Sequence, residues 1–290
     1  MSEQASCIWP AGAVLGEGPL WHPREKRLYW VDIKQPAVHA INPATGARRS
    51  WPMPEDIGCI VPRRGGGFIA GLKTGFARID LDRGSIERIG NPEPDQPGNR
   101  FNDGKCDGAG RFWAGTMDDQ VKRPTGWLYC LDTQGKWTRR DGPYPCTNGP
   151  AFSPDDRTLY HTDTMGRTVY AFDLGADGTP SRKRAFVRFA EVDGYPDGMT
   201  VDSGGCVWVA HWGGWRVTRF RPDGTAERTI RLPVAQVTSC AFGEEDLRTL
   251  YITTASTGLS WAEREAQPLA GGLFAVRTDT AGLECRFYGG

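Results

Sequence analysis

Arg27-Leu28-Tyr29-Trp30-Val31-Asp32 is a short run of aromatic and branched residues that ends in a carboxylate. After a polar step the chain continues with a second such run, Val38-His39-Ala40-Ile41-Asn42, and then a glycine-containing turn. Aromatic and β-branched residues favour strands, so the two runs together predict a β-hairpin. The same pattern recurs in five later segments, which begin at Gly67, Arg111, Thr158, Cys206 and Thr249.

The spacing of these six units is nearly regular. From Leu28 to Phe68, Phe112, Leu159, Val207 and Leu250 the steps are 40, 44, 47, 48 and 43 residues. A period of this length, with about four short strands in each unit, is typical of the blades of a β-propeller. An irregular β-sandwich would not explain six evenly spaced units. We therefore predict an all-β fold in which residues 1–290 form a single six-bladed β-propeller domain.

The sequence also predicts how the ring closes and how little helix it contains. A strand near Cys7 to Trp9 should close the ring beside the C-terminal strands, because closure removes the exposed edges of open sheets. Helix should be scarce, since no window has a sustained 3.6-residue apolar period. The charged segment from Ala262 to Gln267 is the one place where a helical turn is expected.

The amino-acid composition limits the kinds of molecule that the protein is expected to bind. Lys plus Arg equals Asp plus Glu at 35 each, so the formal net charge is zero. Nucleic acids and anionic membranes both favour a basic surface, and neither is expected to be the main partner. The eight cysteines are scattered without a Cys-x-x-Cys pair, which predicts buried free thiols. Without an evident signal peptide or membrane helix, a cytoplasmic protein with no obligate protein partner is expected.

A glycine-containing register recurs near the start of the strand that precedes each hairpin. In a propeller the first strand of every blade lines the central axis, so residues that share one register in all blades converge there. Five of the six units have Gly second in this register, where it permits positive φ or close backbone approach. The residues before this second position are, in chain order, Glu17, Ile57, Asp103, Asn148, Asp197 and Ser239. The sequence therefore predicts that three carboxylates and one amide meet at one end of the channel.

Such a cluster of oxygen atoms points to a cation. Three carboxylates packed together repel one another and lose their hydration. Oxygen ligands suit one hard or borderline divalent ion that keeps positions open for water and substrate, and Fe²⁺, Zn²⁺, Mn²⁺, Ca²⁺ and Mg²⁺ all remain open. The alternative is a water-filled polar channel in which the carboxylates lie apart or protonated.

The stretches around these residues resemble the motifs of the gluconolactonase/regucalcin (senescence marker protein) family. The resemblance covers essentially the whole chain, with the motifs in the family's order, and is strongest to bacterial sugar-acid lactonases such as xylonolactonase and arabinonolactonase. The matching motifs are Leu15-Gly16-Glu17-Gly18-Pro19-Leu20-Trp21, Arg100-Phe101-Asn102-Asp103-Gly104-Lys105, Thr147-Asn148-Gly149-Pro150, His161-Thr162-Asp163 and Tyr195-Pro196-Asp197-Gly198.

The resemblance also implies roles for individual residues. It implies a divalent metal held by Glu17, Asn148 and Asp197, and it implies that Arg100 and Asn102 hold the substrate hydroxyls and carbonyl. Asp103 matches a further site acid, for which a supporting place beside the metal ligands is our interpretation.

The motifs leave the roles of several other residues less fixed. Family members often carry an acid shortly after Gly115-Thr116-Met117. Here Asp118-Asp119-Gln120 follows, and we take Asp119 as the substrate-binding residue, with its two neighbours as alternatives. Lys73 and Trp212 are expected on loops that border the mouth of the channel, and His161 is expected to be a core residue satisfied by Asp163.

The predicted function is a metal-dependent hydrolase that opens aldonic-acid (pentono or hexono) lactones, most closely a xylono- or arabinonolactonase, with a small-molecule sugar lactone as its partner. The metal would polarise the ring carbonyl, and Asp197 or the metal would activate water as the base. A Gly-x-Ser-x-Gly elbow is absent, so a serine nucleophile lacks its usual landmark. The alternatives are a gluconolactonase, a phosphotriesterase-like hydrolase in the same metal cup, and a non-catalytic propeller scaffold.

Overall fold

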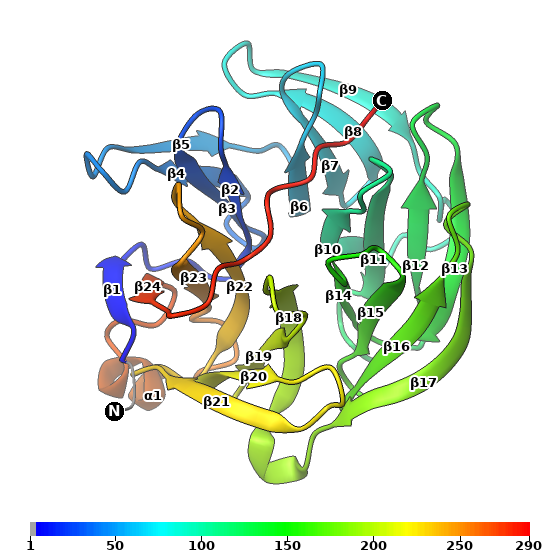
Figure 1. The fold of residues 1–290 in the computed structure, drawn as a ribbon. Helices are drawn as coiled ribbons and strands as arrows, with labels where there is room; N and C mark the ends of the chain where they lie inside the picture. Colours follow the sequence, from blue (N-terminus) through cyan, green and yellow to red (C-terminus); the bar gives the residue numbers. More distant parts are fainter. Residues whose placement is uncertain (1–3) are drawn as a thin grey trace.

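The structure, a computed structural model, describes residues 4–290 and contains six four-stranded antiparallel sheets arranged around a central axis (Figure 1). Blade 1 consists of β2 (Gly16–His22), β3 (Arg27–Asp32), β4 (Ala37–Ile41) and β5 (Arg48–Pro52). Blade 2 consists of β6 (Ile57–Pro62), β7 (Phe68–Leu72), β8 (Gly75–Asp80) and β9 (Ser85–Gly90). Blade 3 consists of β10 (Asn99–Cys106), β11 (Phe112–Asp118), β12 (Gly126–Leu131) and β13 (Trp137–Tyr144).

The second half of the chain repeats this arrangement. Blade 4 consists of β14 (Thr147–Phe152), β15 (Thr158–Asp163), β16 (Thr168–Leu174) and β17 (Pro180–Arg188). Blade 5 consists of β18 (Tyr195–Val201), β19 (Val207–Trp212), β20 (Arg216–Phe220) and β21 (Ala226–Arg231). Blade 6 consists of β22 (Val237–Gly243), β23 (Thr249–Thr254), β24 (Leu273–Arg277) and β1 (Ser6–Trp9). The predicted six-bladed propeller is confirmed.

The ring closes in blade 6, where the two ends of the chain share one sheet. The order β22-β23-β24-β1 places the N-terminal strand outside the last C-terminal strand, with Ser6 paired to Ala275 and Cys7 to Phe274. Closure by a strand at Cys7 to Trp9 is therefore confirmed. β1 thus covers the outer edge of β24 and becomes the outermost strand of blade 6.

Apolar side chains fill the space between neighbouring blades. Six clusters of buried residues occur, one at each contact between two adjacent blades. Trp30, Trp113 and Trp208 lie fully buried in the second strands of blades 1, 3 and 5. The indole Nε1 of Trp113 donates to Asp107 Oδ2 at 2.8 Å, and that of Trp208 donates to Asp202 Oδ2 at 2.8 Å. These tryptophans therefore act as core residues.

Within residues 4–290, helical structure is confined to two short elements. The helix α1 (Trp261–Ala266) begins one residue before the predicted turn, since Ser260 caps it and Glu263 accepts a hydrogen bond from the Ser260 backbone N–H at 2.7 Å. A 3₁₀ turn, η1 (Glu191–Asp193), was not predicted. Among residues 4–290 no helix is long and apolar enough to cross a membrane. All eight cysteines are free thiols, as predicted, and six of them are buried. Cys7 and Cys285 are partly exposed.

The segment after β24 crosses one end of the ring. Figure 1 shows this C-terminal segment, in red, running from β24 across the axis toward β8. Its backbone is bonded to blade 6 through Gly282 and Leu247, to blade 5 through Ala281 and Ser203, and to blade 2 through Tyr288. We call residues 279–290 the C-terminal strap. It covers the end of the channel that lies opposite the candidate site described below.

Candidate active site

The glycine-containing register identified in the sequence lies within the innermost strand of each blade. In β2, β6, β14 and β18 the pairing with the second strand shifts at the glycine of this register, and in β10 and β22 it shifts one residue before the register begins. A β-bulge of this kind redirects side chains, here toward the axis. Gly18 and Gly149 adopt φ of 53° and 72° at the shift, and a Cβ on Gly58 would lie 2.3 Å from the Phe101 carbonyl oxygen.

The bulges divide the channel into two cavities. The residues before the shift line a cavity of about 360 Å³, which we call the upper cavity. Of the predicted site residues, six line it: Glu17, Arg100, Asn102, Asp119, Asn148 and Asp197. Trp212 lines it as well, whereas Lys73 borders a separate cavity of about 210 Å³ that shares Arg100. The structure thus brings the predicted metal ligands and the predicted substrate contacts into one space.

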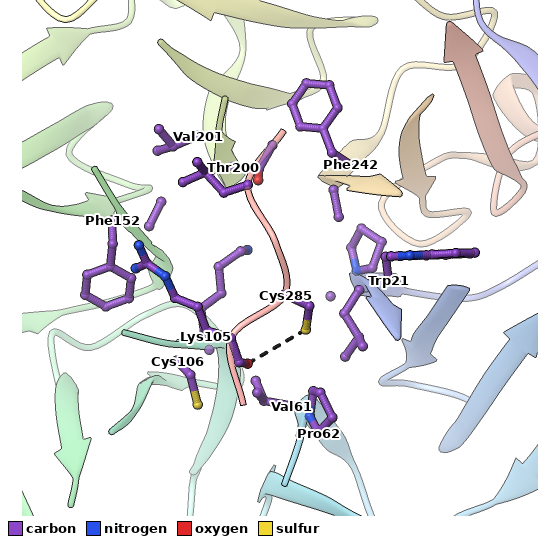
Figure 2. Close-up of a pocket in the computed structure, with 18 of the residues that line it drawn as sticks. Trp21, Val61, Pro62, Lys105, Cys106, Phe152, Thr200, Val201, Phe242 and Cys285 are labelled. Atoms are coloured by element: carbon purple, nitrogen blue, oxygen red, sulfur yellow. Dashed lines mark hydrogen bonds between the residues drawn. The ribbon is translucent and has the colours of Figure 1, made fainter. Parts of the chain in front are cut away.

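The residues after the shift line a smaller cavity of about 120 Å³ beneath the strap. Figure 2 shows this lower cavity, where Lys105 and Cys285 lie among apolar side chains that include Trp21, Phe152 and Phe242. Asp103 lines this lower cavity. The prediction that three carboxylates meet at one end of the channel is therefore wrong for Asp103, because the bulge at Asn102 turns the following residue to the other side.

Two buried carboxylates remain in the upper cavity. Burial, followed by the charge of Asp103, raises the pKa of Glu17 to about 8, although its Oε2 accepts a hydrogen bond from the Gly18 N–H at 3.0 Å. Burial and the charges of Glu17 and Asp103 raise the pKa of Asp197 well above its usual range. The Oδ1 atom of Asp197 is buried and has no hydrogen-bond partner among the residues described. Such a pair requires either protons or a cation.

Asn148 completes the set of oxygen atoms and is held from both sides. Its Nδ2 donates to Thr164 Oγ1 at 3.0 Å, and its Oδ1 accepts from Asn102 Nδ2 at 3.0 Å. Within residues 4–290 no group of three or more His, Cys, Asp or Glu side chains is arranged to hold a metal. The candidate centre is instead two carboxylates and an amide. Its hard oxygen donors, with one carboxylate oxygen left unpartnered, fit a divalent ion.

A chain of charged groups forms one wall of the upper cavity. Arg100 is buried, and its Nε donates to Asp119 Oδ1 at 2.6 Å while its Nη1 donates to Asn102 Oδ1 at 2.7 Å. Lys34 donates to both oxygens of Asp119, at 2.6 and 2.8 Å. Burial acts to raise the pKa of Asp119, but Lys34 and Arg100 outweigh it and hold that pKa below its usual value.

The neighbours of Asp119 point elsewhere. The Asp118 carboxylate accepts hydrogen bonds from the backbone N–H groups of Lys122 and Arg123, each at 2.9 Å, and so holds the turn that follows β11. The exposed Gln120 side chain contacts Lys122. Of the three residues after Gly115-Thr116-Met117, Asp119 is the one that lines the upper cavity.

Sequence reasoning missed Lys34 and Thr164, although a topological signal was available. In an antiparallel blade the start of the first strand lies beside the end of the second, as Glu17 beside Val31 shows. The turns that follow the second strands therefore reach the same mouth as the metal ligands. Residues at or just past those strand ends do line the upper cavity, namely Lys34, Asp119, Thr164, Trp212 and Thr257.

The assignment of Asp163 as the partner of His161 is wrong. His161 is fully buried, and its Nδ1 lies 2.9 Å from Asp141 Oδ2 on the neighbouring blade. Asp163 instead accepts a hydrogen bond from the Gly166 N–H at 2.9 Å in the turn after β15. Residues two apart in a strand face the same side, so the Asp163 and His161 side chains lie next to each other without pairing, and His161 bonds instead across the interface between blades to Asp141. It remains a core residue, as expected.

The fold and the oxygen donors of the upper cavity define a six-bladed propeller with a polar site at one end of its channel. Residues 15–256 match the family described as SMP-30/Gluconolactonase/LRE-like region, and the chain belongs to this family. The resemblance noted in the sequence is thereby confirmed.

Three similar proteins illustrate the family. The chain is 39% identical to a 6-deoxy-6-sulfogluconolactonase of Pseudomonas putida, over 97% of each chain. It is 41% identical to a pentonolactonase of Haloferax volcanii, over 83% of this chain and 81% of that one. The crystal structure of a calcium-binding protein, regucalcin, from Agrobacterium tumefaciens superposes with a TM-score of 0.94 at 27% identity, covering 99% of this chain and 97% of that chain.

Proposed function

We propose that the chain is a metal-dependent sugar lactonase that opens pentono- or hexonolactones to the aldonic acid. The observation that carries this proposal is the buried pair Glu17 and Asp197 beside Asn148, at the floor of a cavity that also holds Arg100 and Asn102. Two of the similar proteins above are named lactonases, one of them for pentonolactones. A propeller that only bound a protein partner would not need two buried carboxylates with unmet charge.

Glu17, Asn148 and Asp197 are the residues that would hold the divalent ion. When bound there, the ion would supply Lewis-acid polarisation of the lactone carbonyl. Oxygen donors do not select one ion, so Fe²⁺, Zn²⁺, Mn²⁺, Ca²⁺ and Mg²⁺ remain the candidates, and the similarity to a calcium-binding regucalcin supports Ca²⁺ among them.

The chain's own side chains account for the remaining steps. Asp197 can accept the proton of the attacking water, because it lines the cavity and its Oδ1 is left without a hydrogen-bond partner among the described residues. The water oxygen bonds to the carbonyl carbon, the bond from that carbon to the ring oxygen breaks, and the ring oxygen leaves as a hydroxyl after it takes up a proton. Arg100 and Asn102 would hold the substrate oxygens, with Arg100 offering its Nη2 donors. Asp103 acts from below the cup through its charge.

A lactone panel tests the proposal directly. Proton release is followed at pH 7 with xylono-, arabinono- and gluconolactone and with one phosphotriester, after chelation and after each ion is restored. The expected result is ion-dependent release from at least one sugar lactone at a rate above its spontaneous opening. Full activity after exhaustive chelation would remove the ion from the mechanism, and hydrolysis of the phosphotriester alone would replace the lactone as substrate.

A further inference from the structure

Lys34 joins three blades at the mouth of the upper cavity. It lies in the turn after β3 of blade 1, and its Nζ is 2.7 Å from Asp56 Oδ2, just before β6 of blade 2. The same Nζ donates to both oxygens of Asp119, which follows β11 of blade 3, at 2.6 and 2.8 Å. The Lys34 side chain is 29% exposed and lines the cavity. A substrate in the cavity would therefore meet both the ammonium and the carboxylate that it fixes.

The charges along this wall are balanced. Lys34 and Arg100 are the only cationic residues that line the upper cavity in the part of the chain that the structure describes. Both donate to Asp119, and Lys34 also donates to Asp56, so two cations face two carboxylates. In the cup, Glu17 and Asp197 would in turn be balanced by a divalent ion.

An anionic substituent on a sugar would find no uncompensated cation here. A sulfonate or phosphate would place a further negative charge beside Asp119, whose contacts already offset the charge of both cations, and repulsion between like charges is costly in a partly buried site. A hydroxyl group adds no charge, and it can accept from Lys34 and donate to Asp119 at the same time.

The geometry points to Lys34 as a specificity-determining residue that makes the site select uncharged polyhydroxy lactones over lactones with a sulfonate or phosphate. This inference rests on the proposed lactonase function. Lys34 holds Asp119 in place as a hydroxyl acceptor, and Asp119 and Asp56 together balance the charge of Lys34 and Arg100. On this basis the substrate named for the Pseudomonas putida relative, a sulfonated gluconolactone, does not carry over to this chain despite 39% identity.

The first experiment compares gluconolactone with 6-deoxy-6-sulfogluconolactone on the wild type and on Lys34→Met and Lys34→Arg. The wild type should favour the uncharged lactone in kcat/KM by 10-fold or more. Lys34→Met should raise KM for the uncharged lactone about 10-fold with a smaller change in kcat, and Lys34→Arg should recover most of that loss. Lys26→Met is the matched control, because Lys26 pairs with Glu245 at 2.5 Å on the exposed surface. Its kinetics should equal those of the wild type.

The second experiment changes the charge balance itself. Asp119→Asn removes one of the two carboxylates that face Lys34 and Arg100 and leaves one positive charge in excess, so activity on the uncharged lactone should fall while the preference for it narrows or reverses in favour of the sulfonated one. Adding Lys34→Met to Asp119→Asn should abolish that gain. A wild type that prefers the sulfonated lactone, or a Lys34→Met variant with unchanged KM and unchanged preference, overturns the inference.

A binding measurement separates this inference from the proposed function. Calorimetry with 1,5-anhydroglucitol and its 6-phosphate, which lack the ester, reports recognition without turnover. If no lactone is hydrolysed but the wild type binds the uncharged ring more tightly and Asp119→Asn reverses that order, the proposed reaction fails and the role of Lys34 stands. Equal binding of both rings by the wild type overturns the role of Lys34 whatever the reaction.

Discussion

Asn102 donates its side-chain amide to the side-chain oxygen of Asn148 at 3.0 Å, and this bond joins blade 3 to blade 4 at the floor of the upper cavity. Asn102 Nδ2 also donates to the Thr147 carbonyl oxygen at 2.9 Å, and Asn102 Oδ1 accepts from Arg100. Every polar atom of the Asn102 side chain is thus used within the protein. The Asn102 side chain therefore orients the amide of Asn148, a proposed metal ligand, in addition to any contact with substrate.

Asn102→Ala should therefore weaken metal binding as well as catalysis. Removing an outer partner of a metal ligand typically lowers metal affinity by about 10- to 100-fold. The affinity is measured by competition with a chromogenic chelator, with Gln120→Ala as control because that exposed side chain lies outside the cavity. Unchanged affinity in Asn102→Ala would restrict Asn102 to the substrate side.

Arg100→Ala and Asp197→Ala should separate substrate binding from metal binding. Arg100 contacts Asp119, Asn102 and the Phe101 carbonyl, none of which is a proposed metal ligand. Its loss should lower kcat/KM by about 10²–10³ while stoichiometric metal is retained. Asp197→Ala should lose metal and activity together. Metal content by elemental analysis and kcat/KM decide between the roles, and normal metal content with normal turnover in Asp197→Ala would contradict the assignment.

The sequence was sufficient for the fold because each blade repeats its pattern independently. Aromatic strands about 44 residues apart gave the blade count, and the glycine register located Glu17, Asn148 and Asp197 in one cavity. The glycine register failed for Asp103. In blades 1, 2, 4 and 5 the shift in pairing includes the glycine, whereas in blade 3 it falls at Asn102, before Gly104, so that Asp103 faces the other side. The ion pair of Lys34 with Asp119 spans 85 positions in the chain, and only the closed ring brings the two together.

The C-terminal strap should contribute stability without taking part in catalysis. Tyr288 is fully buried, its hydroxyl donates to the Asp132 carbonyl oxygen at 2.7 Å, and its backbone bonds to Pro62 and Arg64 at 2.9 Å each. Tyr288→Ala should lower the free energy of unfolding by about 3–5 kcal/mol, because it opens a large cavity between blades. Tyr288→Phe, which loses only the hydroxyl bond, should lose about 1 kcal/mol.

Urea denaturation measures both variants, and kcat/KM at a temperature where each is folded tests the second half of this prediction. The strap covers the lower cavity, whereas the proposed ligands line the upper one. Both variants should therefore keep kcat/KM within about twofold of the wild type. A 10-fold loss in a folded Tyr288→Phe protein would show that the lower end of the channel is coupled to the site.

Acid lability should come in part from His211. Its ring is buried, stacks on Phe189 with centroids 4.3 Å apart, and its Nδ1 lies 2.9 Å from the Asp193 carbonyl oxygen. Burial lowers the pKa of His211 to about 4, and the charge of Arg216 adds to this effect. The unfolded chain, with a pKa of about 6.5, binds the proton more readily than the folded one. The stabilising contribution is therefore complete above pH of about 6.5 and is lost as the pH falls toward 4.

Between pH 7 and pH 5 this single group should cost the folded state about 2 kcal/mol. His211→Phe keeps an aromatic ring against Phe189 and removes the titration, whereas His22, His39 and Asp141, which also have lowered pKa values, are common to both proteins. The free energy of unfolding is measured by urea at both pH values. The wild type should lose about 2 kcal/mol more than His211→Phe on acidification, because the shared groups cancel in the difference. An equal loss in both proteins would mean that His211 takes up its proton without unfolding.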